Sequence, residues 1–305
     1  MRILITGAAG FLGKACFTHF KNSSFDVITT DKVYGCDLHG DLLDPNFVNS
    51  LPRVDVVINC AAVQYVTKNK PLFFRKQFFR KNNVDSINNL IARYQESDVL
   101  FINIGTSMQY FQDGSVIYSE KSTVSGQGIY SESKVEAYDL LCASSMRCCT
   151  IVPSIIGGLG REGLFRGFVN SILNFGIAFV PGGGLNPISM VHVDDVVSLI
   201  DIVARTGAIG TYNAAASNSF CINQWIEIVA NVLKRPKVSA VHIPLLPIYI
   251  LSFLSGFRIL AREQLLMLKM PHVIDISASR ALGWNPIFTC EKIIADIVFH
   301  ITQKS

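Results

Sequence analysis

Tyr130 and Lys134 lie four residues apart, so a helix that carries both places them one turn apart on the same face. A free phenol ionises near pH 10, which is too high for a general base at neutral pH. An ammonium group about 4 Å away is worth roughly 4 kcal/mol at an effective dielectric constant of 20, or about three pKa units. The spacing therefore predicts that Lys134 lowers the pKa of Tyr130, which then exchanges a proton with a substrate hydroxyl or ketone.

Two more hydroxyl groups follow an apolar run at residues 99–104. Gly105 ends this run, and Thr106 and Ser107 come directly after it. In a parallel sheet, ligands bind at the carboxyl ends of the strands. We therefore expect Thr106 or Ser107 to hydrogen-bond the oxygen atom that reacts.

Three glycines, Gly7, Gly10 and Gly13, follow the first apolar run of the chain. Their spacing allows a tight turn and close approach of the backbone to a pyrophosphate, which the N-terminus of the next helix then faces. Asp31 ends the second apolar run, where a carboxylate accepts both ribose hydroxyls of NAD and repels the extra phosphate of NADP. Lys32 follows directly and can soften that preference. The pattern predicts an NAD site, with NADP less favoured.

These residues need a scaffold of strands and helices. Short apolar runs predict strands over residues 3–6, 27–30, 54–59, 99–104 and 149–152. Helical spacing predicts helices over 11–20, 83–94 and 131–144, and shorter ones near 196–204 and 224–233. This alternation is typical of a parallel sheet covered by helices. Glycines interrupt it beyond Pro153. We therefore predict an α/β protein with a dinucleotide-binding domain over residues 1–155, to which pieces near 190–235 return, and a smaller, discontinuous substrate-binding lobe over 156–305.

The composition excludes several classes of protein. Half of the 305 residues are apolar and 16% are charged, which favours a large buried core over disorder. A net charge of +4 is too small to suggest a nucleic-acid-binding protein. The eight cysteines form no Cys-x-x-Cys pair, so we expect free thiols in a reducing compartment and no metal site. The first apolar run reaches Gly7 too soon for a signal peptide, and a cytoplasmic location is expected.

Two segments bear on membrane contact. Residues 238–257 carry no Asp, Glu, Lys or Arg, but Pro244 and Pro247 interrupt them, which predicts a buried or pocket-lining helix rather than a membrane-spanning one. Residues 68–81 interleave basic side chains with phenylalanines. Such a stretch is more often a solvated helix whose phenylalanines enter the core, yet it can also lie on an anionic membrane or attract an anionic substrate.

Together these motifs resemble the extended short-chain dehydrogenase/reductases of the NAD-dependent epimerase/dehydratase family, over most of the chain. Further matches are Gly40-Asp41-Leu42, Asn59-Cys60-Ala61-Ala62, the helix start Asn83-Val84 and the V-x-V-D-D motif at 191–195. The resemblance implies a Rossmann-type doubly wound parallel sheet and a catalytic set of Thr106, Tyr130 and Lys134. It implies an NAD site formed by Gly7, Gly10, Phe11, Leu12, Gly13, Asp31, Asp41, Leu42, Ala61, Ala62, Tyr130, Lys134 and Pro153.

The resemblance also implies a mechanism and an assembly. The carbon that bears the substrate hydroxyl gives hydride to the nicotinamide while Tyr130 takes the proton, Thr106 orients the oxygen and Lys134 holds the nicotinamide ribose. An epimerase returns the hydride to the other face of the ketone, whereas a dehydrogenase or reductase releases the cofactor. Family members usually form homodimers, here through the helices at 83–94 and 131–144. The acids of the V-x-V-D-D motif are expected to cap the next helix and fix its packing, with no chemical role for His192.

Three departures from the family pattern narrow the reaction. The 4,6-dehydratases carry acids directly after the catalytic threonine, whereas this chain has Ser107 and Met108, so dehydration is disfavoured. Aliphatic residues stand where relatives that bind nucleotide sugars often have Arg, Asn and Arg, namely at Val152, Ile155 and Ile188.

Other residues are candidates for the substrate contacts. Arg161 and Arg166 can replace the missing phosphate contacts, because guanidinium groups bind phosphates through paired hydrogen bonds; ordinary solvated arginines are the alternative. Ser107 is the third candidate substrate contact.

Three functions remain open. The leading one is an NAD-dependent oxidoreductase or epimerase that acts on a secondary alcohol or ketone of a nucleotide-activated sugar, because residues 182–187 and 275–286 resemble bacterial members of that branch. The first alternative is a 3β-hydroxysteroid-type dehydrogenase with an apolar alcohol as substrate, which the uncharged residues 238–257 suit equally well. The second alternative, a non-catalytic dinucleotide-binding sensor, is disfavoured because such relatives usually lack the Tyr130–Lys134 pair.

Overall fold

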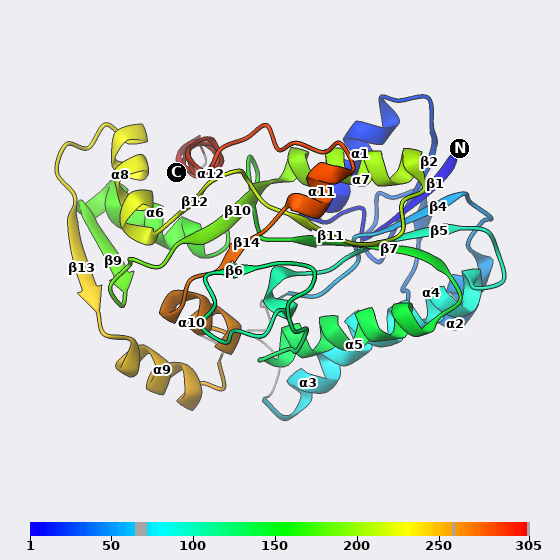
Figure 1. Cartoon of the computed structure of the whole chain (residues 1–305), viewed down its shortest axis with the longest axis horizontal. Coiled ribbons are helices and arrows are strands. Elements are labelled where there is room, and N and C mark those ends of the chain that lie inside the picture. The colour runs from blue at the N-terminus through cyan, green and yellow to red at the C-terminus, as the bar shows by residue number, and fades with distance from the viewer. Residues whose placement is uncertain (65–71, 258–259, 304–305) are drawn as a thin grey trace.

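A seven-stranded parallel sheet forms the centre of the computed structural model, which describes residues 1–64, 72–257 and 260–303 (Figure 1). The strand order is β11-β7-β5-β4-β1-β2-β3. The strands are β1 (Arg2–Thr6), β2 (Asp26–Asp31), β3 (Leu38–His39), β4 (Val56–Asn59), β5 (Leu100–Ile104), β7 (Arg147–Pro153) and β11 (Gly210–Ala214). All five runs predicted as strands lie in this sheet, and the predicted doubly wound α/β fold is confirmed.

Helices cover both faces of the sheet, because successive side chains of a strand point to opposite faces. Ile3 and Ile5 pack into the core under α1 and α7, whereas Leu4 packs into the core under α2, α4 and α5. These helices are α1 (Phe11–Lys21), α2 (Pro45–Ser50), α4 (Ser86–Tyr94), α5 (Ile129–Ala143) and α7 (Val193–Thr206). The sheet thereby fixes where each helix begins relative to the carboxyl ends of the strands.

A second lobe has its own apolar core, which includes Ile188, Trp225 and Ile297. Two small sheets, β12-β10-β8 and β13-β9, belong to this part of the chain. Its elements are β8 (Ile155–Gly157), α6 (Leu164–Phe175), β9 (Ile177–Pro181), β10 (Ile188–His192), β12 (Ser219–Phe220), α8 (Ile222–Val232), β13 (Ser239–Ile243), α9 (Leu245–Leu254), α10 (Arg262–Lys269) and α12 (Cys290–Gln303). The short elements η2 (Ser107–Gln109), β6 (Ile117–Tyr118), β14 (Val273–Ile274) and α11 (Ser277–Ala281) complete the fold. The domain limit at residue 155 stays a prediction.

The helix that was expected to start at Asn83 begins earlier. α3 (Leu72–Arg80) continues through the π-helical turn η1 (Lys81–Asp85) into α4, so the predicted start is wrong. The Asn83 side chain accepts a hydrogen bond from the Val63 N–H at 2.8 Å and donates to Ser133 Oγ at 2.9 Å. The widened turn thus places an inward-facing amide between the chain after β4 and α5.

The N-terminus of α7 is capped by a histidine rather than by the acids of the V-x-V-D-D motif. His192 Nδ1 accepts a hydrogen bond from the Asp194 N–H at 3.2 Å, so the expected capping by the acids is wrong. The buried Asp195 carboxylate instead accepts from the N–H groups of Ile287 and Phe288, at 2.9 and 3.0 Å. This acid therefore holds the segment before α12 against α7.

The uncharged segment at 238–257 is mostly exposed. It forms β13 and α9, and Ser252 is the buried residue of α9, so the prediction of a buried helix is wrong, and that of a pocket-lining helix stays a prediction. No helix among the described residues is long and apolar enough to cross a membrane. In the basic segment, Phe79 is buried and Phe74 is exposed, while Lys68 and Lys70 lie outside the described residues.

Candidate functional site

The turn between β1 and α1 is built for close approach. Gly7 has φ +65°, and a Cβ atom there would lie 2.5 Å from the Ala61 nitrogen. A Cβ atom on Gly13 would lie 2.2 Å from the Gly7 carbonyl oxygen. Both positions exclude a side chain, and among the described residues no side chain caps α1 at Gly10. The backbone N–H groups of the first turn are therefore available to an anionic group such as a pyrophosphate.

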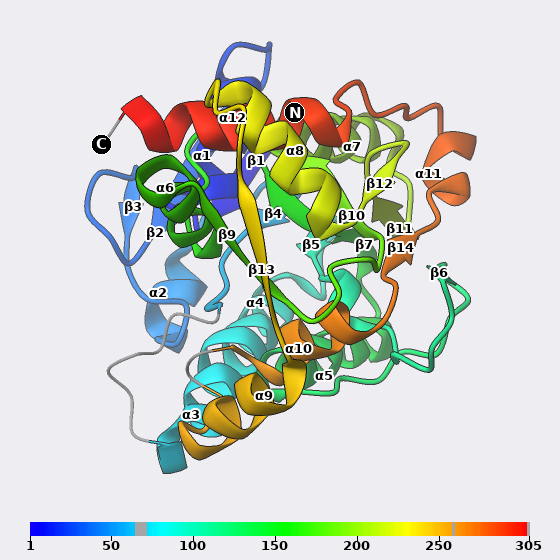
Figure 2. The same cartoon turned by 90° about the vertical axis from the view of Figure 1, so that its left-hand side faces the viewer.

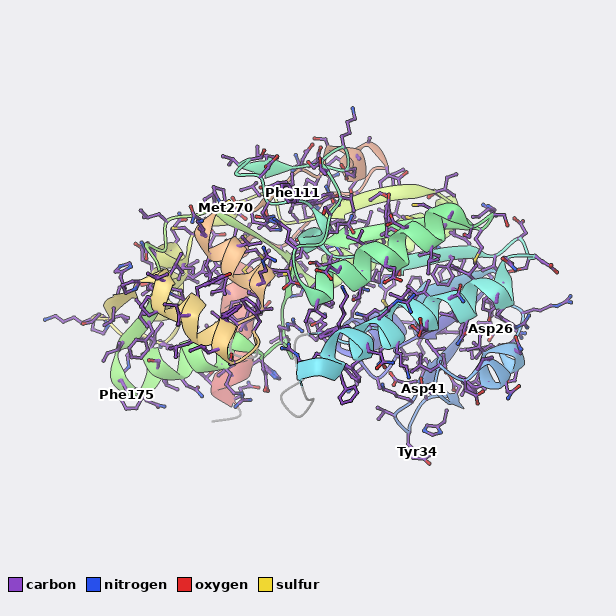
Figure 3. The ribbon with its side chains drawn as sticks, turned by 90° about the horizontal axis from the view of Figure 1, so that it is seen from below. Asp26, Tyr34, Asp41, Phe111, Phe175 and Met270 are labelled. Atoms are coloured by element: carbon purple, nitrogen blue, oxygen red, sulfur yellow. The ribbon has the colours of Figure 1, made fainter. Side chains whose placement is uncertain are left out.

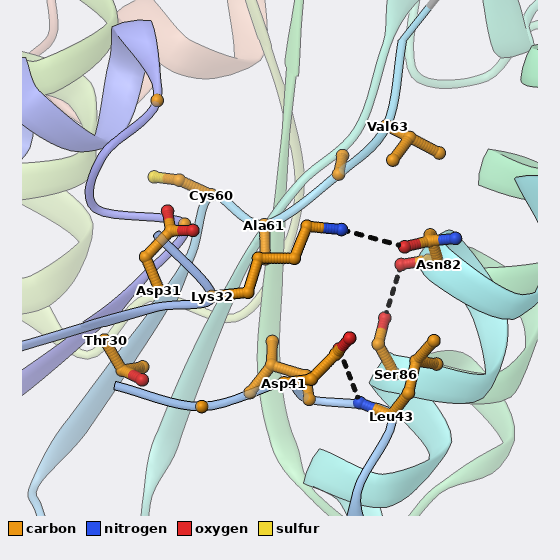
Figure 4. A pocket seen from close by; sticks show the side chains of 15 residues that line it. Thr30, Asp31, Lys32, Asp41, Leu43, Cys60, Ala61, Val63, Asn82 and Ser86 are labelled. Carbon is orange, nitrogen blue, oxygen red and sulfur yellow. Dashed lines mark hydrogen bonds between the residues drawn. The ribbon is translucent and has the colours of Figure 1, made fainter. Parts of the chain in front are cut away.

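A groove opens beside this turn (Figure 4). It is lined by Gly7, Gly10, Thr30, Asp31, Lys32, Gly40, Asp41, Leu42, Leu43, Cys60, Ala61, Ala62, Val63, Asn82 and Ser86. Seven of the residues predicted to bind NAD are among them: Gly7, Gly10, Asp31, Asp41, Leu42, Ala61 and Ala62. The chain ends of β1, β2 and β4 thus meet at one side of the sheet, as expected for a dinucleotide site.

The other predicted NAD residues are not among those that line this groove. Leu12 packs into the core under α1, and Pro153 is buried in β7 opposite Ala214 of β11. The Arg161 guanidinium lies over the Phe11 ring, and its central carbon is 5.7 Å from the ring centre. The side chains of Leu12 and Pro153 therefore pack beneath the groove, whereas the Leu12 N–H belongs to the first turn of α1 that faces a pyrophosphate.

Asp31 is held firmly at the groove. Its carboxylate accepts hydrogen bonds from the Ala9 N–H at 3.0 Å and the Val33 N–H at 3.1 Å. Lys32 reaches across the groove, where its Nζ donates to Asn82 Oδ1 at 3.3 Å (Figure 4). The groove thus combines a fixed acid, suited to ribose hydroxyls, with a cation one residue further along.

Sequence reasoning missed several groove residues. Ser86 and Asn82 project from α4 and η1, and the Ser86 hydroxyl donates to the Asn82 carbonyl at 2.6 Å. The buried Thr30 hydroxyl has no hydrogen-bond partner in the described part of the chain. An unpaired buried hydroxyl at the groove fits a site completed by a polar ligand. Asn82 could have been found from its place directly before the Asn83-Val84 motif.

The three predicted catalytic residues come together at the carboxyl end of β5. Tyr130 and Thr106 are both buried and share a hydrogen bond. Lys134, one turn further along α5, donates from Nζ to the Ile104 carbonyl at 2.7 Å. The strand and the first turns of the helix therefore hold the phenol, hydroxyl and ammonium groups beside one another.

The predicted lowering of the Tyr130 pKa by Lys134 is wrong for this arrangement. Burial raises the pKa of Tyr130 to about 12, against the hydrogen bond from Thr106, which lowers it. Burial also lowers the pKa of Lys134 to about 8. At neutral pH the phenol thus holds its proton and Lys134 remains largely charged.

A buried acid from α10 reaches the N-terminus of α5, which no sequence signal predicted. Glu263 Oε1 accepts from the Ser131 N–H at 3.0 Å and from the Ser131 hydroxyl at 3.1 Å. Its charge favours the N-terminal end of a helix and raises the pKa of Tyr130. Glu263 therefore ties the lobe to the helix that carries Tyr130 and Lys134.

Ser107, a predicted substrate contact, is buried in a polar chain. His272 Nε2 lies 2.9 Å from Ser107 Oγ, and His272 Nδ1 lies 2.7 Å from Gln112 Nε2. Since the Gln112 amide nitrogen can only donate, Nδ1 accepts and Nε2–H donates to Ser107. Burial lowers the pKa of His272 to about 4, so the ring is neutral at pH 7. Ser107 is thus a positioned hydroxyl and Met108, its neighbour, packs against the lobe core.

The two predicted phosphate-binding arginines differ in their surroundings. Arg161 contacts Gln64 Oε1 at 3.4 Å and lies over Phe11, and its charge lowers the pKa of Tyr130. Arg166 forms an ion pair with Glu162 at 2.7 Å. Arg161 is therefore the one that lies between the glycine turn and the catalytic tyrosine.

Comparison with known proteins places these motifs in context. The model of the NAD dependent epimerase/dehydratase family matches residues 3–215. A dTDP-D-glucose 4,6-dehydratase of Dictyostelium discoideum is 28% identical over 254 residues, which cover 70% of this chain and 57% of that protein. A 3-beta-hydroxysteroid dehydrogenase of Mycolicibacterium neoaurum is 22% identical over 344 residues, which cover 99% of this chain and 92% of that protein. The chain thus spans little more than half the length of the first of these relatives.

Solved structures share the fold over the whole chain. The protein MoeE5, in complex with UDP-glucuronic acid and NAD, has a TM-score of 0.79 at 18% identity, with all of both chains covered. The UDP-glucose 4-epimerase of Thermotoga maritima, with UDP-glucose, has a TM-score of 0.78 at 18% identity and covers 100% of this chain and 99% of its own. At this level of identity the likeness shows a common fold.

Proposed function

The chain belongs to the NAD dependent epimerase/dehydratase family, whose members are NAD-dependent enzymes, and we propose that it acts on a secondary alcohol or ketone of a nucleotide-activated sugar, as an epimerase or 4-keto reductase. The observation that carries the proposal is the cluster of Thr106, Tyr130 and Lys134 at the end of β5, adjoining the groove that holds Asp31.

Each residue of the cluster has a task in hydride transfer. Bound NAD supplies the hydride acceptor, or NADH the donor, at the carbon that carries the reacting oxygen. Tyr130 holds its proton at neutral pH and gives it to the ketone oxygen during reduction. During oxidation its phenolate form takes the proton of the substrate hydroxyl, and Thr106 donates a hydrogen bond that stabilises this phenolate. The Lys134 ammonium, fixed by the Ile104 carbonyl, offers further hydrogens to the phenolate or to a ribose hydroxyl.

Loss of water from the sugar is disfavoured in this site. A dehydration needs an acid that protonates the leaving hydroxyl, and Ser107 and Met108 follow Thr106 instead. The Ser107 hydroxyl accepts from His272, whose ring is neutral at pH 7 and cannot act as a strong acid there. The proposal therefore keeps the reaction to oxidation, reduction or epimerisation, although a relative from Dictyostelium is named a dehydratase.

A nucleotide sugar is supported by relatives and by one arginine. Three of the four compared proteins are named for dTDP-D-glucose or were solved with UDP-glucuronic acid or UDP-glucose. Arg161 lies over Phe11 and acts electrostatically on Tyr130, so its guanidinium can grip a diphosphate whose sugar faces the phenol.

Titration calorimetry of UDP and dTDP into the NAD-saturated protein tests this proposal. We expect binding in the micromolar to sub-millimolar range, weakened at least about tenfold by Arg161→Ala, since a charge-assisted hydrogen bond is worth about 1.5–3 kcal/mol. Arg205→Ala is the matched control, because Arg205 pairs with Asp201 on α7. Tyr130→Phe should keep NAD and nucleotide binding and lose turnover by about a hundredfold or more.

A hydroxysteroid-type dehydrogenase is the second candidate, favoured by one specific observation. Val152 and Ile188, which stand where arginines are often found, are fully or almost fully buried among apolar side chains. A relative from Mycolicibacterium carries a 3-beta-hydroxysteroid dehydrogenase name. If no nucleoside diphosphate binds and a sterol is oxidised with NAD in a Tyr130-dependent way, this second function replaces the first.

The fate of the cofactor separates the two proposed reactions. An epimerase reuses its NADH in each cycle and should retain NAD through purification, whereas a reductase must exchange it. We therefore expect the absorbance spectrum and mass of cofactor released by acid from the purified enzyme to distinguish them.

A further inference from the structure

Helix α9 is apolar and exposed at once. Six of its ten residues are large apolar side chains that face solvent, and we call them the α9 surface: Leu246, Tyr249, Ile250, Leu251, Phe253 and Leu254. Leu254 is 72% exposed and Phe253 is 61% exposed. Single exposed apolar residues are ordinary, but a helix made of them marks a surface that something covers.

The distribution of these side chains around α9 favours a fluid covering. At 100° per residue, Tyr249 and Leu251 limit an exposed sector of about 200°, and Ser252 lies on the side that is packed. A single helix or flat protein face covers a stripe of about 100°. Hydrocarbon chains, in contrast, surround whatever part of a helix projects into them.

Two segments of the sequence, one of which contains α9, are rich in basic residues. From Ile228 to Arg262 there are five basic residues and no acidic one, and from Val56 to Val84 there are six basic residues and no acidic one. Of these, Lys68, Lys70 and Arg258 lie outside the described residues, and Lys234, Arg235 and Lys237 precede β13 at the end of α6, away from α9. The whole chain has a net charge of only +4, so basic residues are concentrated in these two segments. An anionic surface is complementary to them.

The two basic segments meet in the fold. Arg75 of α3 donates a hydrogen bond to the Gly256 carbonyl directly after α9, and α3 and α9 lie at the same edge of the molecule (Figure 2). Phe74 on α3 is exposed there as well. Lys76 and Arg80 form ion pairs with Glu132 and with Asp85 and Glu136, but their side chains remain more than half exposed.

We propose that the α9 surface docks the enzyme on an anionic lipid bilayer. The apolar side chains of α9 enter the boundary between headgroups and acyl chains, and the exposed basic side chains beside α9, namely Lys76, Arg80, Lys81 and Arg262, face the lipid phosphates. α9 has ten residues and lies on the bilayer rather than across it. This inference is independent of the substrate, because α9 contributes no residue to the groove or to the catalytic cluster.

Vesicle co-sedimentation of the full chain tests the proposal. With phosphatidylcholine vesicles that contain phosphatidylglycerol, we expect binding at low salt that weakens as salt is added, and weaker binding without phosphatidylglycerol. Phe253→Asp should weaken binding at least about tenfold, because the burial of one large apolar side chain strengthens binding to the bilayer by about that factor or more. Leu254→Asp should act in the same direction.

Phe175→Asp is the matched control. Phe175, at the end of α6, is 73% exposed, and it lies at the end of the lobe remote from the groove residue Asp41 (Figure 3). It precedes β9, and β9 pairs in parallel with β13, whose far end leads to α9. We expect this variant to bind vesicles like the unaltered protein. Unaltered NAD affinity in all variants shows that they are folded.

Three results would overturn the proposal. The unaltered protein fails to bind phosphatidylglycerol vesicles at low salt. Phe253→Asp and Phe175→Asp bind vesicles equally well. Phe253→Asp halves the mass in solution, which would assign the α9 surface to a contact between two copies of this chain.

Discussion

The buried ammonium group of Lys134 lowers the folding stability, and we expect the reaction to require its charge. Burial lowers the pKa of Lys134 from 10.5 to about 8, so between these values the unfolded chain binds more protons than the folded one. Stability therefore rises with pH through that window and carries the full penalty at pH 7, on the order of 3 kcal/mol before compensation by the hydrogen bond to Ile104.

We expect Lys134→Met to lose activity by about a hundredfold or more and to keep or raise the melting temperature at pH 7. The excess over the unaltered protein should shrink towards pH 10, because the folded-state lysine is then neutral and the unfolded-state lysine, with its pKa of 10.5, is beginning to lose its proton. Thermal unfolding at pH 7 and pH 10 checks this expectation. A variant that is clearly less stable at pH 7 would show that the ammonium stabilises the fold.

We expect the choice between NAD and NADP to depend on the Asp31 carboxylate. The Ala9 and Val33 N–H groups donate to different oxygens of Asp31, so Asp31→Asn keeps the acceptor for one of them and removes the charge. We expect NAD affinity to fall about tenfold, since hydrogen bonds to charged groups are worth about 1.5–3 kcal/mol, and NADP affinity to rise. Fluorescence titration with both cofactors measures the ratio.

Lys32 provides the control for that ratio. Its Nζ lies at the groove on Asn82, where it is placed to meet a phosphate on the ribose. Added to Asp31→Asn, Lys32→Ala should reduce NADP affinity and leave NAD affinity unaltered. A ratio that does not change in Asp31→Asn would mean that the acid supports the glycine turn without reading the ribose.

At the scale of elements, α10 and α5 are coupled through Glu263. Two charged groups act on Tyr130 from outside its own helix: Glu263 raises its pKa and Arg161 lowers it, while burial dominates. Glu263→Gln keeps an oxygen that accepts from Ser131 and removes the charge. The pKa of Tyr130 should therefore fall.

We expect the pH profile of alcohol oxidation by Glu263→Gln to shift, with its rising limb at lower pH than in the unaltered enzyme. Exposed Glu227 on α8 supplies the control, and Glu227→Gln should leave the profile in place. Measurement of kcat against pH with saturating NAD and alcohol decides. A loss of rate without a shift would reduce Glu263 to a structural link between the lobe and α5.

How far the sequence predicts these elements depends on how local each signal is. Short apolar runs located β1, β2, β4, β5 and β7, because the residues that bury a strand are adjacent in the sequence. Glu263 and His272 escaped, since their partners Ser131 and Ser107 lie 132 and 165 residues away.

The failure at α9 has another cause. An uncharged apolar segment predicts burial, but it does not say whether protein or some other partner buries it, and in this chain the lobe covers one side of the helix. The prediction that Lys134 lowers the pKa of Tyr130 failed for a similar reason. Spacing placed Lys134 one turn away, whereas its hydrogen bond goes to the Ile104 carbonyl, which the sequence does not reveal.

At the scale of the whole molecule, we expect two copies of the chain to form a homodimer that packs the exposed sides of α4 and α5 against each other. Light scattering coupled to size exclusion should give twice 33.6 kDa. Ala92 is small and exposed on α4. In Ala92→Arg the large, charged side chain should prevent the contact between two copies, and the variant should have the monomer mass. Phe253→Asp should keep the dimer mass, because α9 is reserved for the bilayer in this arrangement. If Phe253→Asp dissociates the protein while Ala92→Arg does not, the dimer forms through α9, and the docking on lipid fails with it.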